Sequence, residues 1–334
     1  MQGRTLFAVT LCAFLLAYTV VVLGAYVRLS HAGLGCPDWP GCYGRMVVPS
    51  ADHDVAAPYA GATVHQAKAW KEMIHRYAAG TLGTLIFLIL VLAWRQRRRV
   101  VSPGIATLVA VLVVCQALLG MWTVTWLLKP VVVTAHLLGG MTILSLLCWL
   151  LLSQLFLFNI QDTDRGLRPW VLAGLVVLGL QIFLGGWTSA NYSALACPQF
   201  PTCRDGAWIP PLNFGEAFTL WRGLGINYEG GVLDAAGRTA IHLSHRAGAL
   251  VTFLVLCGVA VRALRSRISA VKKLGLFLFA VLLLQIALGI SNVVFVLPLP
   301  VAVAHNGVAA LLLQTLVALL YLSRCKEMSL KQPR

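Results

Sequence analysis

The stretch Glu72–Gly83, EMIHRYAAGTLG, places His75 and Arg76 at the start of a long apolar run. The same pattern returns in the second half of the chain in IHLSHRAGALV, where His245 and Arg246 open another apolar run. Similarity at a fixed spacing is the signature of an internal repeat. The sequence therefore predicts one helical unit that occurs twice, with a histidine-arginine pair in each copy.

The composition is that of a protein embedded in lipid. Hydrophobic residues make up 59% of the 334 residues and charged residues only 11%, whereas soluble domains carry about 25% charged residues. Several apolar runs reach the ~20 residues needed to cross a bilayer. We expect eight membrane-spanning helices, at Leu6–Val27, Met73–Trp94, Ile105–Leu127, Val131–Phe158, Trp170–Ser189, Thr239–Leu264, Leu274–Val296 and Val301–Ser323.

The net charge of +15 is concentrated on one side of the predicted membrane protein. Arg4 and the segments 95–99, 162–168, 262–273 and 324–334 together hold +13 of it. The positive-inside rule makes this side cytoplasmic, so both termini are expected there and the long loops 28–71 and 190–238 outside. Because topology accounts for the charge, no nucleic-acid partner is expected; the surrounding partner is membrane lipid.

The two halves of the chain align along their whole length. Leu34–Pro49 matches Leu195–Pro210 through the shared pattern CP-x-[WF]-P-x-C, and CQALLGMWTV from Cys115 matches LQIALGISNV from Leu284. Four spans per copy keep both copies in the same orientation, which is a parallel repeat. The predicted fold is an all-α polytopic membrane protein of two duplicated four-helix bundles, at residues 1–160 and 161–334.

A lone histidine opens a further apolar run after each histidine-arginine pair: His136 in VVVTAHLLGG and His305 in VAVAHNGVAA. A histidine within a membrane span is costly and by default indicates function. His75, His136, His245 and His305 all lie near the outer ends of the predicted spans, ~6–9 Å deep. Two facing imidazoles per bundle predict bis-histidine ligation of a haem. Helix capping or core hydrogen bonding are the alternatives, and zinc would need more ligands.

Residues next to the histidines fit the same interpretation. Arg76 and Arg246 place a cation at the outer end of a helix, where haem propionates would pair with it; the alternative is that they reach lipid phosphates. Glu72 lies one turn before His75, whereas the matching position in the second copy is His242. A carboxylate beside one haem can move protons or stabilise a developing cation. It could equally be a solvated headgroup-region residue, and His242 competes with His245 as a ligand.

Two cysteine pairs lie in the predicted outer loops. Cys36 and Cys42 are separated by five residues, as are Cys197 and Cys203. An oxidising compartment outside the membrane would favour a disulfide in each loop, and the spacing permits the required approach of the Cα atoms. Each disulfide would have either a structural or a redox role.

The combined pattern resembles the haem A synthase family. Eight spans, a four-plus-four repeat, E-x-x-H-R in the second span, H-R in the sixth, single histidines in the fourth and eighth and a CP-x-W-P-x-C loop support the resemblance over essentially the whole chain. The presence of a cysteine pair in both outer loops resembles a subset of that family.

The resemblance implies oxidation of the C8 methyl of haem O to a formyl group, which gives haem A for terminal oxidase assembly. It implies haem b as cofactor between His245 and His305, and haem O as substrate near His75, His136 and Glu72. It gives Cys36 and Cys42 a role linked to activity. It also implies a haem O synthase as supplier of the substrate, an unidentified electron donor, and a bacterial-type inner membrane location with the haem sites near the periplasmic face.

Two other functions share the same histidines. A membrane carrier with two b-type haems would pass electrons between quinol and a periplasmic acceptor without altering a haem. A haem transporter or assembly chaperone would hold haem only transiently. Glu72 and the long outer loops favour the synthase over the electron carrier, and a stable bis-histidine spectrum after purification would argue against the transporter or chaperone.

Overall fold

The computed structural model describes residues 2–50, 54–95, 101–155 and 164–324, and this part of the chain is helical with no β-strand. Its eight long helices are α1 (Gln2–Leu29), α2 (Gln66–Arg95), α3 (Pro103–Thr125), α4 (Pro130–Leu155), α5 (Arg168–Ala190), α7 (Ala235–Leu264), α8 (Ser269–Val294) and α9 (Leu299–Leu322). The short helices η2 (Ala57–Tyr59), η3 (Arg165–Leu167) and α6 (Phe214–Ala217) lie between them. All eight long helices are long and apolar enough to cross a membrane, which confirms the predicted spans.

The helices that carry the histidine-arginine pairs begin earlier than predicted. α2 starts at Gln66 rather than Met73, because the polar stretch QAKAWKE consists largely of good helix formers. α7 starts at Ala235 rather than Thr239, because the Asp234 side chain accepts the Gly237 N–H at 2.5 Å and caps the helix. Hydropathy alone missed both polar first turns.

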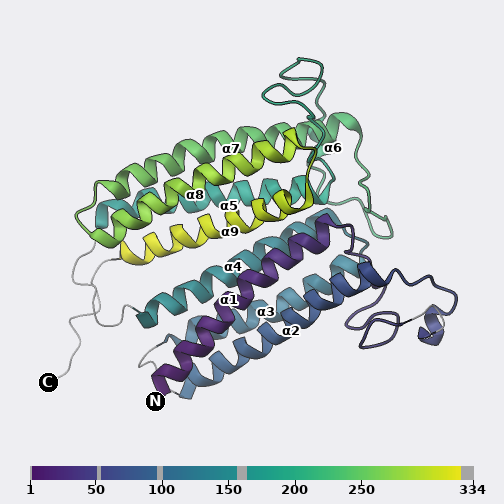
Figure 1. Cartoon of the computed structure of the whole chain (residues 1–334), viewed down its shortest axis with the longest axis horizontal. Coiled ribbons are helices and arrows are strands. Elements are labelled where there is room, and N and C mark those ends of the chain that lie inside the picture. The colour runs from purple at the N-terminus through teal and green to yellow at the C-terminus, as the bar shows by residue number, and fades with distance from the viewer. Residues whose placement is uncertain (1, 51–53, 96–100, 156–163, 325–334) are drawn as a thin grey trace.

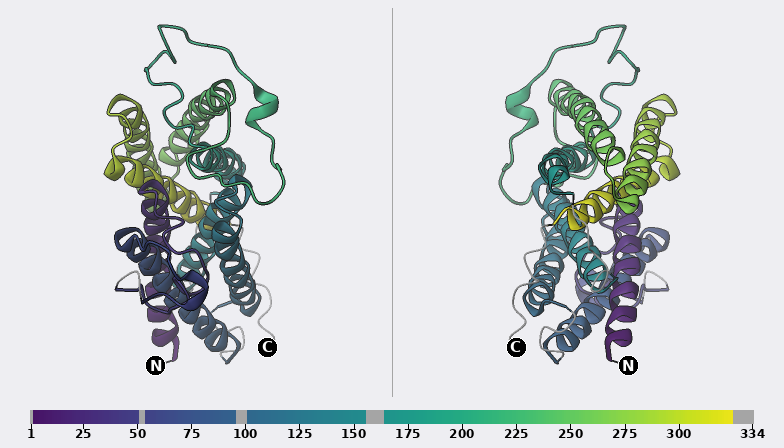
Figure 2. Two further views of the ribbon diagram at one scale, coloured as in Figure 1. Left: turned by 90° about the vertical axis from the view of Figure 1, so that its right-hand side faces the viewer. Right: turned by 90° about the vertical axis from the view of Figure 1, so that its left-hand side faces the viewer.

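The long helices pack in two sets of four (Figure 1, Figure 2). In the first, α1 and α3 each contact both α2 and α4; in the second, α5 and α8 each contact both α7 and α9. The sets meet where α4 contacts α5 and α9, and where α1 contacts α9. A continuous hydrophobic core runs through both sets. The predicted division after residue 160 lies outside the described residues.

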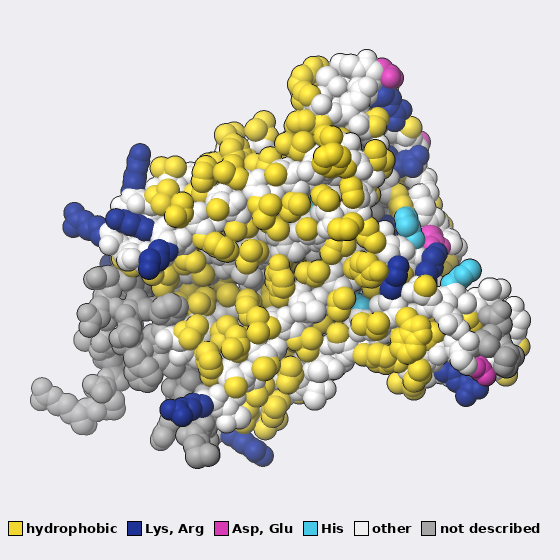
Figure 3. Space-filling view, viewed as in Figure 1, with side chains coloured by type: hydrophobic (Ala, Val, Ile, Leu, Met, Phe, Trp, Pro, Cys, Tyr) yellow, Lys and Arg dark blue, Asp and Glu magenta, His cyan; other side chains and the backbone are white. Residues whose placement is uncertain are grey.

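The surface has the distribution of side chains expected of a membrane protein. Figure 3 shows hydrophobic side chains over the flanks of the long helices and basic side chains at the ends of the molecule. α1 begins and α9 ends at the same end, opposite the long loops (Figure 1). Of the predicted basic side, Arg97, Arg98, Arg99 and the residues after Arg324 lie outside the described part of the chain.

Residues at matching positions of the repeat meet where the outer ends of α1 and α5 approach each other. The Arg28 guanidinium donates to the Ser189 carbonyl at 2.7 Å and lies over the Tyr192 ring, 4.2 Å from its centroid. His31 stacks on Tyr192 with ring centroids 5.8 Å apart. The alignment that matches Cys36 with Cys197 also matches Arg28 with Ser189 and His31 with Tyr192, so each pair joins equivalent positions of the two copies.

Candidate functional site

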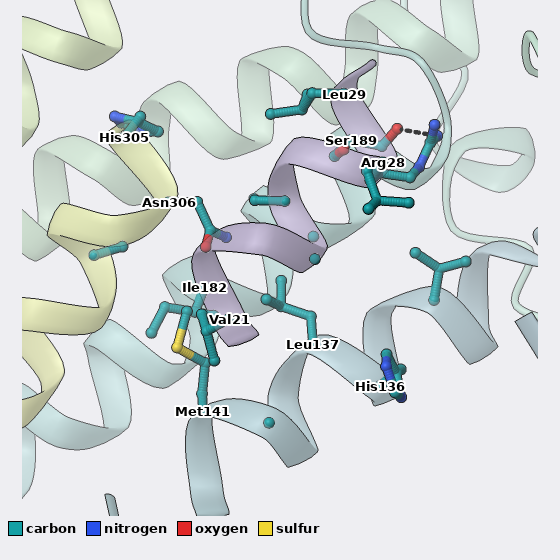
Figure 4. Close-up of a pocket in the computed structure, with 18 of the residues that line it drawn as sticks. Val21, Arg28, Leu29, His136, Leu137, Met141, Ile182, Ser189, His305 and Asn306 are labelled. Carbon is teal, nitrogen blue, oxygen red and sulfur yellow. Dashed lines mark hydrogen bonds between the residues drawn. The ribbon is translucent and has the colours of Figure 1, made fainter. Parts of the chain in front are cut away.

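The four histidines line one cavity at the outer ends of the helices. His75 lies on α2 and His136 on α4, while His245 lies on α7 and His305 on α9. The cavity has a volume of 1610 Å³ and is lined by all four imidazoles, whereas a single small-molecule site has about 300–1,000 Å³. In Figure 4 the end of α1 passes between His136 and His305. The cavity is therefore large enough for two ligands.

Each imidazole lies against a glycine of a neighbouring helix. A Cβ added to Gly24 or Gly289 would lie 3.2 Å from the Cε1 atom of His75 or His305, respectively. At Gly185 the corresponding distance to His245 is 3.3 Å, and at Gly120 the distance to His136 is 3.4 Å. Such contacts are tighter than ordinary van der Waals contact, so a larger residue would displace the ring. The glycines therefore determine where all four imidazoles sit.

The imidazoles are half-buried and make few hydrogen bonds. Within the part of the chain that the structure describes, the Nδ1 atoms of His75, His136 and His305 are buried and have no hydrogen-bond partner. The Nδ1 atom of His245 lies 3.0 Å from the Gln181 amide nitrogen. Buried polar atoms normally have partners, so imidazoles with an unpartnered nitrogen beside a cavity are suited to a ligand. An apolar cavity with two imidazoles per site fits a haem, whose iron accepts histidine ligands.

The first disulfide loop is held against α2 by Glu72 and Arg76. The Glu72 carboxylate accepts the Cys36 N–H at 2.9 Å and pairs with the Arg76 guanidinium. Arg76 also donates to the carbonyls of Asp38, at 2.8 Å, and Gly41. Charge-assisted hydrogen bonds of this kind are stronger than neutral ones. Glu72 is 5% exposed and lines the cavity, so it is not a solvated surface residue.

The second disulfide loop is held in the same way by His242 and Arg246. The His242 Nδ1 accepts the Cys197 N–H at 3.1 Å, and its Nε2 lies 3.2 Å from the Arg246 Nε. Arg246 donates to the carbonyls of Cys197 and Thr202, both at 2.9 Å. Both imidazoles of α7 line the cavity, but both ring nitrogens of His242 lie against nitrogens of Cys197 and Arg246, which leaves His245 as the better-placed ligand.

Both cysteine pairs form the expected disulfides. Cys36 is bonded to Cys42 with Cα atoms 4.7 Å apart, and Cys197 to Cys203 with Cα atoms 4.3 Å apart. All four cysteines are fully buried. Each disulfide loop, together with the arginine that binds its carbonyls, covers the outer end of a histidine-bearing helix.

A family model described as cytochrome oxidase assembly protein matches residues 7–317. A haem A synthase of Shewanella oneidensis is 45% identical over 96% of this chain and 96% of its own length. This chain belongs to the haem A synthase family. A haem A synthase of Halalkalibacterium halodurans is 24% identical over 89% of this chain and 90% of its own length, and one of Bacillus cereus is 26% identical over 57% and 59%.

In this haem A synthase family member, the predicted histidines, the two arginines and Glu72 all line one cavity. The arginines also have hydrogen-bond partners that the sequence did not predict. Arg76 and Arg246 were expected beside haem propionates, and they bind loop carbonyls instead of lying free. The glycines against the histidines were missed as well. Their signal was present in the repeat, because its alignment matches Gly24 with Gly185 and Gly120 with Gly289.

Proposed function

We propose that this chain is a haem A synthase that oxidises the C8 methyl group of haem O to a formyl group. The observation that supports this most is the duplicated pair of imidazoles that line one cavity, in a chain of that family. The conversion is a four-electron oxidation, most simply two successive hydroxylations followed by loss of water from the gem-diol. An external electron-transfer partner is part of the proposal.

The two pairs of histidines have different roles in this proposal. His75 and His136 bind the iron of the substrate haem O in the N-terminal half, residues 1–160. His245 and His305 bind haem b in the C-terminal half, residues 161–334. Haem b supplies one-electron redox chemistry when bound. The contact of Gln181 with His245 supports this assignment, because a partner on Nδ1 orients a ligand imidazole. The matching position in the N-terminal half is Val20.

Glu72 is the difference between the halves that supports a reactive N-terminal site. It places a carboxylate one turn from His75 in the cavity wall, where the C-terminal half has the neutral acceptor His242. A carboxylate there holds a proton acceptor close to the substrate and stabilises positive charge that develops on it. Arg76 and Arg246 contribute by holding the disulfide loops over the two sites, and any contact with propionates adds to that role.

The proposal includes a location and partners. The histidines lie at the end of the molecule that carries the long loops, which the charge distribution assigns to the periplasmic side of a bacterial inner membrane. Both termini are then cytoplasmic. A haem O synthase supplies the substrate, and the product serves terminal oxidase assembly.

Acid extraction and mass analysis of haems tests the proposed activity. Cells that make this chain together with a haem O synthase should contain a formyl haem, which cells without this chain should lack. Unchanged haem O, with haem b still bound to the purified protein, would contradict the synthase and favour the two-haem electron carrier.

We expect Gly185→Val to weaken haem b binding. The added side chain would meet His245, whose Cε1 would be 3.3 Å from the Cβ alone. Overpacking costs about 1–3 kcal/mol, so the affinity should fall by about 5- to 150-fold. Absorbance titration of the purified apoprotein with haem b measures this change.

Gly179→Val is the matched control, because a Cβ at Gly179 on the same helix has no neighbour within 4 Å. It should bind haem b as the unsubstituted protein does. Equal losses in the two variants would mean that the contact between Gly185 and His245 does not position the ligand.

A further inference from the structure

The cavity wall below the histidines differs between the two halves. Residues on α2 and α3 line the N-terminal part, and residues at matching repeat positions on α7 and α8 line the C-terminal part. Three pairs contrast a small residue with a large one; they are Gly80 and Leu250, Gly83 and Phe253, and Ala117 and Ile286. Two further pairs on α3 and α8 place valine against leucine. The N-terminal part is therefore wider along this wall.

The glycines of α2 face open space. A Cβ added to Gly80 or Gly83 would meet nothing within 4 Å, whereas the four glycines at the histidines are in close contact with the rings. Gly80 and Gly83 follow His75 by five and eight residues, which at about 1.5 Å per residue places them ~7 and ~12 Å further into the membrane. Gly80 and Ala117 are also exposed on the membrane-facing surface. The wide part of the cavity thus forms a groove that leads from the histidines to the lipid-facing surface between α2 and α3.

In one pair of lining residues, the larger side chain lies in the N-terminal half. Leu82 is larger than its counterpart Thr252, but Leu82 is 6% exposed and belongs to the hydrophobic core behind the groove. At the inner end, Phe87 lines the groove and is 47% exposed. The exposed mouth of the groove therefore lies between Gly80 and Phe87. The residues along its sides, Gly80, Gly83 and Ala117, are small.

We propose that this groove receives the farnesyl-bearing side chain of the substrate haem, and that Leu250 and Phe253 exclude such a side chain from the C-terminal site. The inference rests on the proposed function, because haem O carries this chain and haem b does not. The unpartnered Nδ1 atoms of His75 and His136 mark the ligand site from which the groove leads.

The physical origin of the selectivity is shape rather than hydrophobic affinity. Lipid is as apolar as the groove, so transfer of the farnesyl chain from the bilayer into the groove gains little free energy. A bulky residue in its path, however, forces strain on a well-packed site. The groove admits the chain without a clash, while the wall of α7 and α8 accepts only a haem without it.

Gly83→Phe introduces into α2 the residue found in α7 and tests the groove. The purified variant, with haem b on the C-terminal site, is titrated with haem O and separately with haem b, and binding is followed by absorbance and by extracted haem content. Haem O affinity should fall by about tenfold or more, while affinity for added haem b should change by less than about twofold. The control Thr84→Phe adds the same ring to the next, exposed position of α2, outside the cavity lining, and should change neither.

The converse variant, Phe253→Gly, makes the test independent of any folding defect in Gly83→Phe. Combined with His75→Ala, it should yield purified protein that contains haem O at the C-terminal site when cells make haem O; His75→Ala alone should contain only haem b. Equal affinity of Gly83→Phe for both haems, or no haem O in the double variant, would contradict the proposal that the groove receives the farnesyl chain. If the unsubstituted protein forms formyl haem in those experiments, the proposed function stands regardless; if it neither binds haem O nor forms formyl haem, the proposed function itself fails.

Discussion

His75→Ala should reduce formation of formyl haem at least about a hundredfold, because it removes one of the two proposed iron ligands from the substrate site. Loss of residues that merely orient a ligand already costs about 10–100-fold in metal affinity, and loss of the ligand itself should cost no less. Extracts of cells that make the variant and a haem O synthase should contain haem O and no formyl haem by mass analysis.

The repeat provides the matched variant for this experiment. His245→Ala removes the equivalent imidazole of α7, which also faces a glycine on the neighbouring helix. His75→Ala should keep haem b in the purified protein with its bis-histidine spectrum, and His245→Ala should lose it. If His75→Ala instead lost haem b, the assignment of substrate and cofactor to the two halves would be reversed.

The second large effect is expected at Glu72. Glu72→Gln should lower formyl haem formation by about 10²–10⁴-fold, the usual contribution of a general acid-base group. Binding of haem O should change little, because the amide oxygen can still accept the Cys36 N–H that the carboxylate accepts at 2.9 Å. Single-turnover formation of formyl haem and haem O titration separate these two quantities.

Glu72→His distinguishes a chemical role from a structural one. It introduces the residue that holds the second loop, where the His242 Nδ1 accepts the Cys197 N–H. The first disulfide loop should therefore stay anchored, which limited proteolysis of that loop can measure, while activity stays low. Full activity in Glu72→His with a protected loop would show that Glu72 serves only to hold the loop.

Much of the fold could be predicted from the sequence because bilayer thickness imposes a simple rule on length and polarity. The number of spans followed from hydropathy, and both disulfides followed from the spacing of Cys36, Cys42, Cys197 and Cys203. The histidines could be singled out because an ionisable group is rare in a span. These features could be predicted because they depend on the polarity and chemistry of the residues themselves and on their spacing in the sequence.

The features that sequence reasoning missed depend on neighbours from distant parts of the chain. The role of Gly185 becomes visible only when α5 is placed beside His245 of α7. Arg76 suggested an anionic ligand, yet its partners include backbone carbonyls, which any loop sequence could offer. The early start of α2 was missed because its first turns are polar and give no hydropathy signal.

The contact of Arg28 with Ser189 has an evolutionary consequence. These residues occupy the same position in the two copies, and they meet where the copies approach each other. In an ancestral homodimer of the four-helix unit, an arginine at this position would have faced its own copy, and two guanidinium groups would have repelled each other. In a single chain that carries both copies, each copy can change alone, and here Arg28 stands in one copy and Ser189 in the other. A single arginine that faces a helix-end carbonyl of the other copy is thus available to a chain with both copies and not to a symmetric dimer, in which both copies would carry the arginine.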